Sequence, residues 1–247
     1  MINIKSKREI ALMKEAGKYN IIVHEELKKN IKVGVTTETL DKIAYNLIKK
    51  LGCEPSCLGY EGYPKTLCIS INDEVVHGIP SKRKIKNGDL VSIDLVLSFQ
   101  GYHADATRTY IVGETSKEKR DLVENTKKAF YEGVKVVKEG VKVKEIGSAI
   151  EKFAHEHNLS VVEELVGHGI GIYMHEDPEI PNFKNDSNIV LKAGMVIAIE
   201  PMLNLGSKEV YVKNNEWTIS TVDGLASAHY ENTVLVTKDG YEILTGE

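Results

Sequence analysis

The sequence predicts a mixed α/β (α+β) fold in which two related halves share one central sheet. Helical and strand segments follow one another in the same order in each half. Glycine turns recur at one fixed offset, and no linker rich in proline, glycine and serine separates the halves. We therefore expect a single domain over residues 1–247, with an internal repeat whose halves are residues 1–112 and 113–247.

Composition predicts a core that is stable without disulfide bonds. The 247 residues include 32 Lys and Arg against 36 Asp and Glu, and 42% are hydrophobic. A chain of this length buries enough apolar surface for a stable fold. The three cysteines, Cys53, Cys57 and Cys68, lack the spacing of a zinc site. A disulfide framework and a thiolate metal site are both disfavoured.

Charge and hydropathy exclude several classes of partner. The net charge of -4 argues against a dedicated DNA-binding protein. The amino terminus has no apolar core of a signal peptide, and no run of about 18 uncharged apolar residues occurs. We expect a cytoplasmic protein that binds neither DNA nor a membrane.

A helix is expected near the start of each half. Ser6 and Glu9 have the spacing of a capping box and open an amphipathic segment. Thr115 and Glu118 have the same spacing in the second half. The first long helix of each half is therefore predicted to begin at these residues.

A second helix in each half follows a glycine turn. Gly34 leads into a helix expected over residues 41–50, and Gly140 leads into one expected over residues 147–157. The two glycines are 106 positions apart.

The same offset appears where a glycine turn enters a buried strand that ends on an acid. Gly88 precedes Asp94, and Gly194 precedes Glu200, again 106 positions apart. Because two chance matches would not share one offset, the pattern favours an internal duplication. Two unrelated halves with coincidental glycine turns remain the alternative.

Two aspartates are predicted to face each other across a hairpin. Residues 90–97 and 102–112 alternate as strands, and a turn centred on residues 99–100 places Asp94 directly opposite Asp105. Two such carboxylates repel unless one is protonated or a divalent cation binds both. A register shifted by one residue, which would turn one acid to solvent, stays open.

The second half supplies further candidate ligands. Glu200 ends an apolar strand, Glu231 lies in a strand expected over residues 228–236, and His168 lies among closely spaced glycines. Singly, each is typical of an ordinary surface or core residue. Together with Asp94 and Asp105 they form an oxygen-rich set that suits two ions such as Mn, Fe, Co or Zn. Two such ions can activate a water and stabilise a tetrahedral intermediate.

Nine short motifs, spread over almost the whole chain, match one enzyme family. They are PSCLGY (55–60), YP (63–64), CISIN (68–72), VHGIP (76–80), ID (93–94), HAD (103–105), GHGIG (167–171), IEPM (199–202) and YENT (230–233). On these motifs the chain resembles type I methionine aminopeptidases of peptidase family M24, in their short bacterial form. The resemblance implies the pita-bread fold, in which two pseudo-symmetric α/β halves surround a central antiparallel sheet.

The resemblance implies a dinuclear metal centre. Its five expected ligands are Asp94, Asp105, His168, Glu200 and Glu231. Asp105 and Glu231 would bridge two divalent ions (Co, Mn, Fe or Zn), and Glu200 would also act as general base.

The resemblance also implies a substrate pocket. His77 would contact the substrate near the scissile bond, and His175 would bind the peptide carbonyl and stabilise the developing oxyanion. The walls of the S1 pocket would be Cys57, Tyr60, Tyr63, Cys68, Met174 and Trp217. Sulfur and aromatic edges pack well against a thioether.

The implied activity is removal of the initiator methionine from nascent chains with a small second residue. A hydroxide held by the metals would attack the first peptide bond. We expect a monomer that meets nascent polypeptide N-termini. The basic run at residues 81–86 would contact the ribosome near the exit tunnel, unless it is a plain solvated loop. Ile2 is not small, so the protein should retain its own Met1.

Five positions depart from the family pattern without removing a ligand. They are Glu61, Val96, Ile172, Tyr173 and Asn232. These departures are compatible with a specialised form of the enzyme that has altered metal affinity or turnover. Two rival classes also remain: a proline-specific pita-bread peptidase, and a pita-bread module that binds peptides without cleaving them.

Overall fold

The helix that opens the chain is determined by its cap. The computed structural model describes residues 2–246, so Met1 and the prediction about its retention lie outside the described residues. Ser6 caps helix α1 (Lys7–Asn30) with a complete capping box to Glu9, as predicted. In the second half the prediction was wrong by one residue, because Ser116 caps α3 (Lys117–Lys135) and accepts from Lys119 N. The Thr115 hydroxyl instead donates to the Gly88 carbonyl at 3.2 Å.

The second helix of each half begins earlier than expected. Helix α2 (Thr37–Lys50) and helix α4 (Val143–Glu156) both have 14 residues, and each starts four residues before its predicted start. The residue before each helix forms an isolated antiparallel bridge, and the helix begins directly after that residue. The bridges are Thr36 with Lys84 and Lys142 with Val190. All of these positions keep the 106-residue offset, and we propose a duplicated unit within one domain as its origin.

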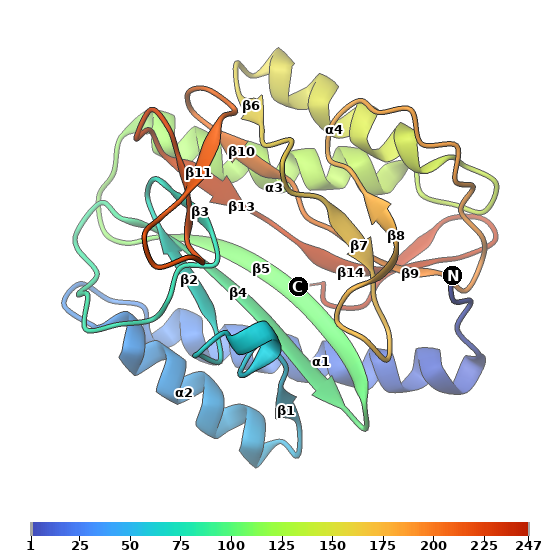
Figure 1. Ribbon diagram of the computed structural model, residues 1–247, viewed down its shortest axis with the longest axis horizontal. Helices are drawn as coiled ribbons and strands as arrows, with labels where there is room; N and C mark the ends of the chain where they lie inside the picture. Colours follow the sequence, from blue (N-terminus) through green and yellow to red (C-terminus); the bar gives the residue numbers. More distant parts are fainter. Residues whose placement is uncertain (1, 247) are drawn as a thin grey trace.

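Long antiparallel sheets lie between the helices (Figure 1). In the first half, β4 (Leu90–Phe99) pairs with β1 (Glu54–Pro55), β2 (Cys68–Ile71) and β5 (Tyr102–Ile111). In the second half, the order is β15 (Tyr241–Ile243), β14 (Asn232–Val236), β9 (Val196–Ile199), β7 (Gly167–Gly169) and β8 (Glu176–Ile180). Helices α1 and α2 lie along one side of these sheets, and α3 and α4 lie along the opposite side.

Two three-stranded sheets complete the fold. One has the order β13 (Ser227–His229), β10 (Met202–Asn204) and β6 (Ser160–Val161). The other has the order β11 (Val210–Val212), β12 (Ile219–Thr221) and β3 (Glu74–Val76). A short 3-10 helix spans Tyr60–Gly62. Within residues 2–246, no helix has both the length and the apolar character that crossing a membrane requires.

Each half has its own apolar core beneath its helices. Leu40 and Ile93 are fully buried in the first core, and Phe130 and Ile197 are fully buried in the second. Each such side chain contributes about 1.5–3 kcal/mol when it is removed from water. The two cores include residues of strands β4 and β9, which position Asp94 and Glu200.

The hairpin of β4 and β5 corrects the predicted register. Phe99 pairs with Tyr102, so the turn consists of Gln100 and Gly101, whose φ values of +50° and +81° fit a two-residue type I′ turn. Asp94 therefore faces Thr107 rather than Asp105, and the predicted direct pairing was wrong by two residues. Because side chains alternate with period two, this shift keeps both aspartates on one face as diagonal neighbours.

Candidate active site

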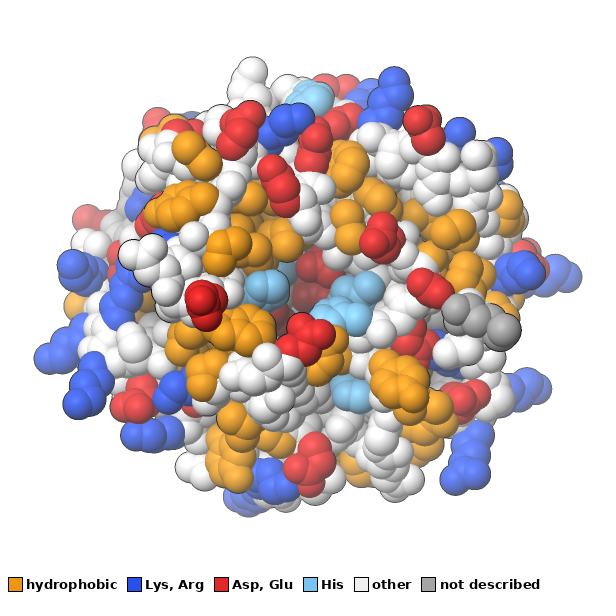
Figure 2. Space-filling model, viewed as in Figure 1, with side chains coloured by type: hydrophobic (Ala, Val, Ile, Leu, Met, Phe, Trp, Pro, Cys, Tyr) orange, Lys and Arg blue, Asp and Glu red, His pale blue; other side chains and the backbone are white. Residues whose placement is uncertain are grey.

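A cavity of about 430 Å³ opens on the face shown in Figure 2. Acidic side chains lie at its floor, and histidine and apolar side chains surround them. Its lining includes every residue that the sequence proposed for the site: Cys57, Tyr60, Tyr63, Cys68, His77, Asp94, Asp105, His168, Met174, His175, Glu200, Trp217 and Glu231. The fold therefore gathers the whole predicted set, although its members come from both halves.

Five strands or strand ends present the acids and the imidazole. Asp94 projects from β4 and Asp105 from β5, while His168 is the central residue of β7. Glu200 follows directly after β9, and Glu231 lies between β13 and β14. These elements belong to three different sheets, so only the tertiary fold brings the side chains together.

The strand predicted over residues 228–236 is broken at Glu231. The Tyr230 N–H donates to the Pro201 carbonyl, and the Glu231 N–H donates to the Thr107 carbonyl at 3.1 Å. The backbone thus changes partner between β13 and β14. This exchange directs the Glu231 side chain into the cavity.

The acids and imidazoles form two groups that could each hold a metal ion. Asp105, His168 and Glu231 form one group, and Glu200, His229 and Glu231 form the other. Within each group the potential ligand atoms lie within 4.8 Å of one another. Glu231 belongs to both groups, which suits a carboxylate that bridges two ions.

Unpartnered atoms in this cluster test whether a cation fits. Among residues 2–246, Asp94 Oδ1, Asp105 Oδ1, Glu231 Oε1 and His229 Nε2 are buried without a hydrogen-bond partner. Buried polar atoms are normally hydrogen-bonded, and buried carboxylates are normally paired or bound to metal. The donor set therefore fits divalent cations well.

The pKa values of these groups also favour a bound cation. Burial raises the pKa of Asp105, Glu200 and Glu231 well above their usual ranges, and neighbouring carboxylates raise each pKa further. Burial lowers the pKa of His168 to about 3 and that of His229 to about 4. Neutral imidazoles and crowded acids are a poor arrangement alone but a suitable one around positive charge.

Neighbouring groups hold the acids in place. The Thr107 hydroxyl donates to Glu231 Oε2 at 2.8 Å, and the Asp105 N–H donates to the Thr233 hydroxyl at 2.9 Å. Asn232, which departs from the family pattern, is fully buried, and its amide oxygen accepts from Arg108 at 2.7 Å. Arg108 also donates to the Glu231 carbonyl, so this departure anchors the backbone beside a candidate ligand.

Sulfur and aromatic groups form the apolar wall. Cys57, Tyr63, Cys68, Val96 and Met174 pack into one buried cluster with Trp217 at its edge. The Trp217 ring meets Tyr63 edge-on, with centroids 5.1 Å apart. Val96, another departure, adds apolar surface to this wall. Cys53 lies in the core of the first half instead.

The two cavity histidines are placed differently. His77 follows β3 with φ +56°, and burial lowers its pKa to about 4. His175 Nδ1 lies 2.9 Å from Tyr60 Oη, and its ring centroid is 4.4 Å from that of His168. Burial also lowers the pKa of His175. Both rings are therefore neutral at pH 7 and able to donate one hydrogen bond without carrying charge.

Several site residues were not predicted. His229 Nε2 lies 3.6 Å from Glu200 Oε2, and its place two residues before Glu231 was the available signal. Val76, Leu165, Val166, Gly167, Glu179 and Met202 line the cavity without having been predicted, and two of the departures from the family pattern, Glu61 and Val96, also line it. Val76, Gly167 and Met202 belong to quoted motifs, whereas the position of Glu179 in β8 offered no sequence signal. Ile172 and Tyr173 are exposed and lie beside the cavity residue Met174.

Comparison with known proteins defines the class. Residues 11–238 match the model of metallopeptidase family M24. Methionine aminopeptidase 1 of Bacillus subtilis (strain 168) is 45% identical over 246 residues, which are 99% of each chain. The solved methionine aminopeptidases of Rickettsia prowazekii and Thermotoga maritima align with TM-scores of 0.98, at 38% and 41% identity, over 100% of both chains.

The chain therefore belongs to metallopeptidase family M24 and, within it, to the methionine aminopeptidases, which makes it a metallo-aminopeptidase. The pita-bread fold implied by its motifs is confirmed by the same structural matches. Membership in a metallopeptidase family implies use of divalent metal, in agreement with the unpartnered acidic oxygens.

Proposed function

We propose that this protein removes the initiator methionine from polypeptides whose second residue is small. The observation that carries the proposal is one juxtaposition inside a single cavity. Crowded acids with unpartnered oxygens lie at the floor, and a buried wall of sulfur and aromatic groups stands beside them. The first feature suits metal-assisted hydrolysis, and the second suits a thioether side chain.

The cavity orients the substrate by its two chemistries. The methionine side chain packs against Cys57, Cys68, Met174 and Trp217, while the free α-amine lies near the acids. The residue after methionine then lies close to the metal-binding floor, where a bulky side chain would collide. The same wall disfavours a proline-specific peptidase, because its sulfur and aromatic groups suit a methionine side chain.

Five residues would hold two divalent ions: Asp94, Asp105, His168, Glu200 and Glu231. When bound, ions such as Mn, Fe, Co or Zn would supply Lewis-acid activation of water and of the peptide carbonyl. Glu231 belongs to both candidate ligand groups, and Asp105 belongs to one of them. His229 Nε2 lies 3.6 Å from Glu200 Oε2, and the two belong with Glu231 to one candidate ligand group.

The remaining steps belong to this chain's own residues. Glu200 accepts the proton of the attacking water and passes it to the leaving amine. His175, oriented by Tyr60, donates a hydrogen bond to the carbonyl oxygen as negative charge develops there. His77 contacts the peptide near the scissile bond. The buried wall excludes bulk water from the methionine side chain.

The natural substrates on this proposal are nascent chains in the cytoplasm, and the protein acts on them as a monomer. The run at residues 81–86 would face the ribosome near the exit tunnel. Lys82, Lys84 and Lys86 are exposed, whereas Arg83 is engaged by Glu74 at 3.0 Å. Three lysines thus remain for a phosphate backbone.

The test uses metal-stripped protein reloaded with Mn, Co, Fe or Zn. Peptides Met-Ala-Ser, Met-Ile-Ser, Leu-Ala-Ser and Ala-Pro-Ser separate the side-chain requirements, and Asp105→Ala is the control for the metal centre. We expect methionine release from Met-Ala-Ser alone, and its loss in Asp105→Ala.

Other outcomes contradict the proposal in distinct ways. Cleavage of Ala-Pro-Ser alone assigns the proline-specific activity. Equal cleavage of Leu-Ala-Ser and Met-Ala-Ser would show that the sulfur and aromatic wall does not select methionine. Absence of turnover with every metal assigns a binding module.

A further inference from the structure

The three-stranded sheet β11-β12-β3 carries two side chains of the cavity wall outside the acid cluster. Strand β3 ends directly before His77, and Trp217 lies in the turn that leads into β12. The two segments touch where the Thr218 hydroxyl donates to the His77 carbonyl at 3.3 Å. The places of His77 and Trp217 therefore depend on how β12 sits against β3.

Backbone pairing between β12 and β3 is short and irregular. It consists of Ile219 with Val76 and Ser220 with Glu74, and a bulge interrupts the register between them. The next residue of the chain after β3, His77, has a positive φ that residues with a Cβ seldom adopt. Beyond these pairs the Thr221 N–H donates to the Asp73 carbonyl at 2.9 Å, and side chains supply the rest of the anchoring.

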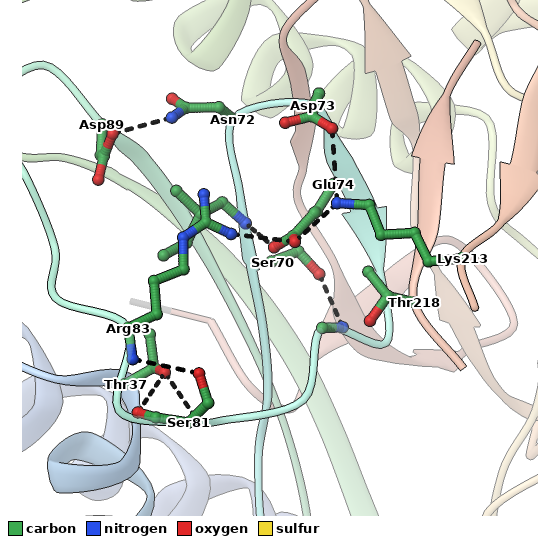
Figure 3. Close-up of polar contacts among 12 residues, drawn as sticks. Thr37, Ser70, Asn72, Asp73, Glu74, Ser81, Arg83, Asp89, Lys213 and Thr218 are labelled. Carbon is green, nitrogen blue, oxygen red and sulfur yellow. Dashed lines mark hydrogen bonds and ion pairs between the residues drawn. The ribbon is translucent and has the colours of Figure 1, made fainter. Parts of the chain in front are cut away.

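One carboxylate supplies that anchoring (Figure 3). Glu74 Oε2 accepts from the Ile71 N–H at 2.9 Å, and Oε1 lies 3.0 Å from Arg83 and 2.9 Å from Lys213 Nζ. Lys213 Nζ is also 3.6 Å from Asp73 Oδ2. The Glu74 side chain is only 11% exposed, unlike a typical surface ion pair.

Lys213 is the base of the turn that carries Trp217. The Lys213 N–H donates to the Thr218 carbonyl at 2.8 Å. Inside the turn, Asn215 Oδ1 accepts from the N–H groups of Trp217 at 3.2 Å and Thr218 at 2.9 Å. The turn is therefore one hydrogen-bonded unit, and a shift at Lys213 moves Trp217 with it.

We infer that Glu74 is a positioning residue, which holds the 213–218 turn against β3 through Lys213 and so sets Trp217 in the methionine pocket. The inference rests on the proposed function for the identity of that pocket. Arg83 contributes less to this positioning. It belongs to the loop at residues 81–86, and none of these residues lines the cavity.

Intrinsic fluorescence tests this directly, because Trp217 is the only tryptophan in the chain. In the full-length protein, Lys213→Met should shift the emission to the red and increase quenching by acrylamide. With Mn²⁺ and Met-Ala-Ser, KM should rise about three- to tenfold while kcat stays within about twofold, since binding rather than chemistry is lost. Lys213→Arg should restore both readouts.

The matched control is Lys208→Met. It removes an ion pair to Glu163 at 2.7 Å just before the same hairpin and should leave emission and KM unchanged. Unchanged emission in both Lys213→Met and Glu74→Gln would overturn the inference, as would an equal shift in Lys208→Met. Fluorescence needs no turnover, so a wild-type protein that releases no methionine contradicts the proposed function while leaving this test intact.

Discussion

The Thr107 hydroxyl donates to Glu231 Oε2 at 2.8 Å and joins the two halves at the floor of the cavity. Thr107 comes from β5, whereas Glu231 lies between β13 and β14. The bond leaves Glu231 Oε1 unpartnered and directed at the candidate metal centre. It thereby fixes which carboxylate oxygen is available to a cation.

Removal of this hydroxyl should weaken metal binding. Thr107→Val keeps the shape of the side chain but leaves Glu231 without its donor, and we expect about tenfold weaker Mn²⁺ binding, because groups that orient metal ligands have effects of this size. Isothermal titration calorimetry of the metal-stripped protein measures it. Thr126→Val removes another buried hydroxyl, one that donates within α3, and should leave the affinity unchanged. Equal affinities for wild type and Thr107→Val would refute the expectation.

Metal should stabilise the fold measurably. A cation that binds only the folded state at about 100 times its Kd adds about 2.7 kcal/mol, which corresponds to about 5–10 °C in Tm for a chain of this size. A thermal melt with and without Mn²⁺ measures the shift.

The matched control is the pair of substitutions Asp105→Asn and Glu231→Gln in one chain. This variant should not respond to Mn²⁺, and its metal-free Tm should exceed that of the wild type, because two repelling acids are gone. A response equal to that of the wild type would place the metal elsewhere.

A buried ion pair near His175 should set part of the acid stability. Lys5 Nζ lies 2.6 Å from Glu176 Oε2, and the two side chains are 5% and 4% exposed. Burial raises the pKa of Glu176, but the bonds from Lys5 and from the Tyr173 N–H outweigh it and leave the pKa below its usual value of 4.5. A lowered carboxyl pKa gives stability that is present above pH 4.5 and lost as the pH falls through the folded pKa.

Glu176→Gln should therefore have a flatter dependence of Tm on pH below about 4.5 than the wild type, because that carboxylate no longer titrates. Thermal melts between pH 3 and 7 measure the slope. Glu242→Gln removes an exposed pair with Lys14 and should keep the wild-type slope, since such pairs contribute little. Parallel curves for wild type and Glu176→Gln would contradict the assignment.

Backbone packing beside His168 should tolerate no side chain. A Cβ on Gly169 would lie 2.1 Å from the Asp177 carbonyl oxygen. Gly169→Ala should lower the free energy of unfolding by about 1–3 kcal/mol, as overpacking does. Urea denaturation measures it. Gly240→Ala meets no atom within 4 Å and should be neutral, so an equal loss at both positions would exclude steric overlap as the cause.

Much of this protein could be predicted from its sequence, because interactions between residues close in the chain determine it. The Ser6 and Glu9 capping box depends on residues three apart, and the glycines at 34 and 140 adopt φ values of +88° and +87° that suit glycine itself. The site residues that the motifs suggested line one cavity, and they could be named in advance because the resemblance extends over almost the whole chain.

Tertiary structure decided what depends on partners far apart in the chain. The register of Asp94 and Asp105 followed from a two-residue turn at Gln100 and Gly101, and the break at Glu231 followed from a change of strand partner. Thr115 was displaced as a cap by Ser116 because its hydroxyl bonds Gly88 in another segment.

The sequence by itself thus determined the Ser6 cap of α1, the repeat offset and the identity of the acids, since each depends on residues close in the chain or on a shared motif. Only the tertiary structure decided that His229 joins Glu200 and that Glu74 ties Lys213 to β3. Those contacts join residues between 29 and 139 positions apart, and their geometry is set by sheet packing, which no local pattern encodes.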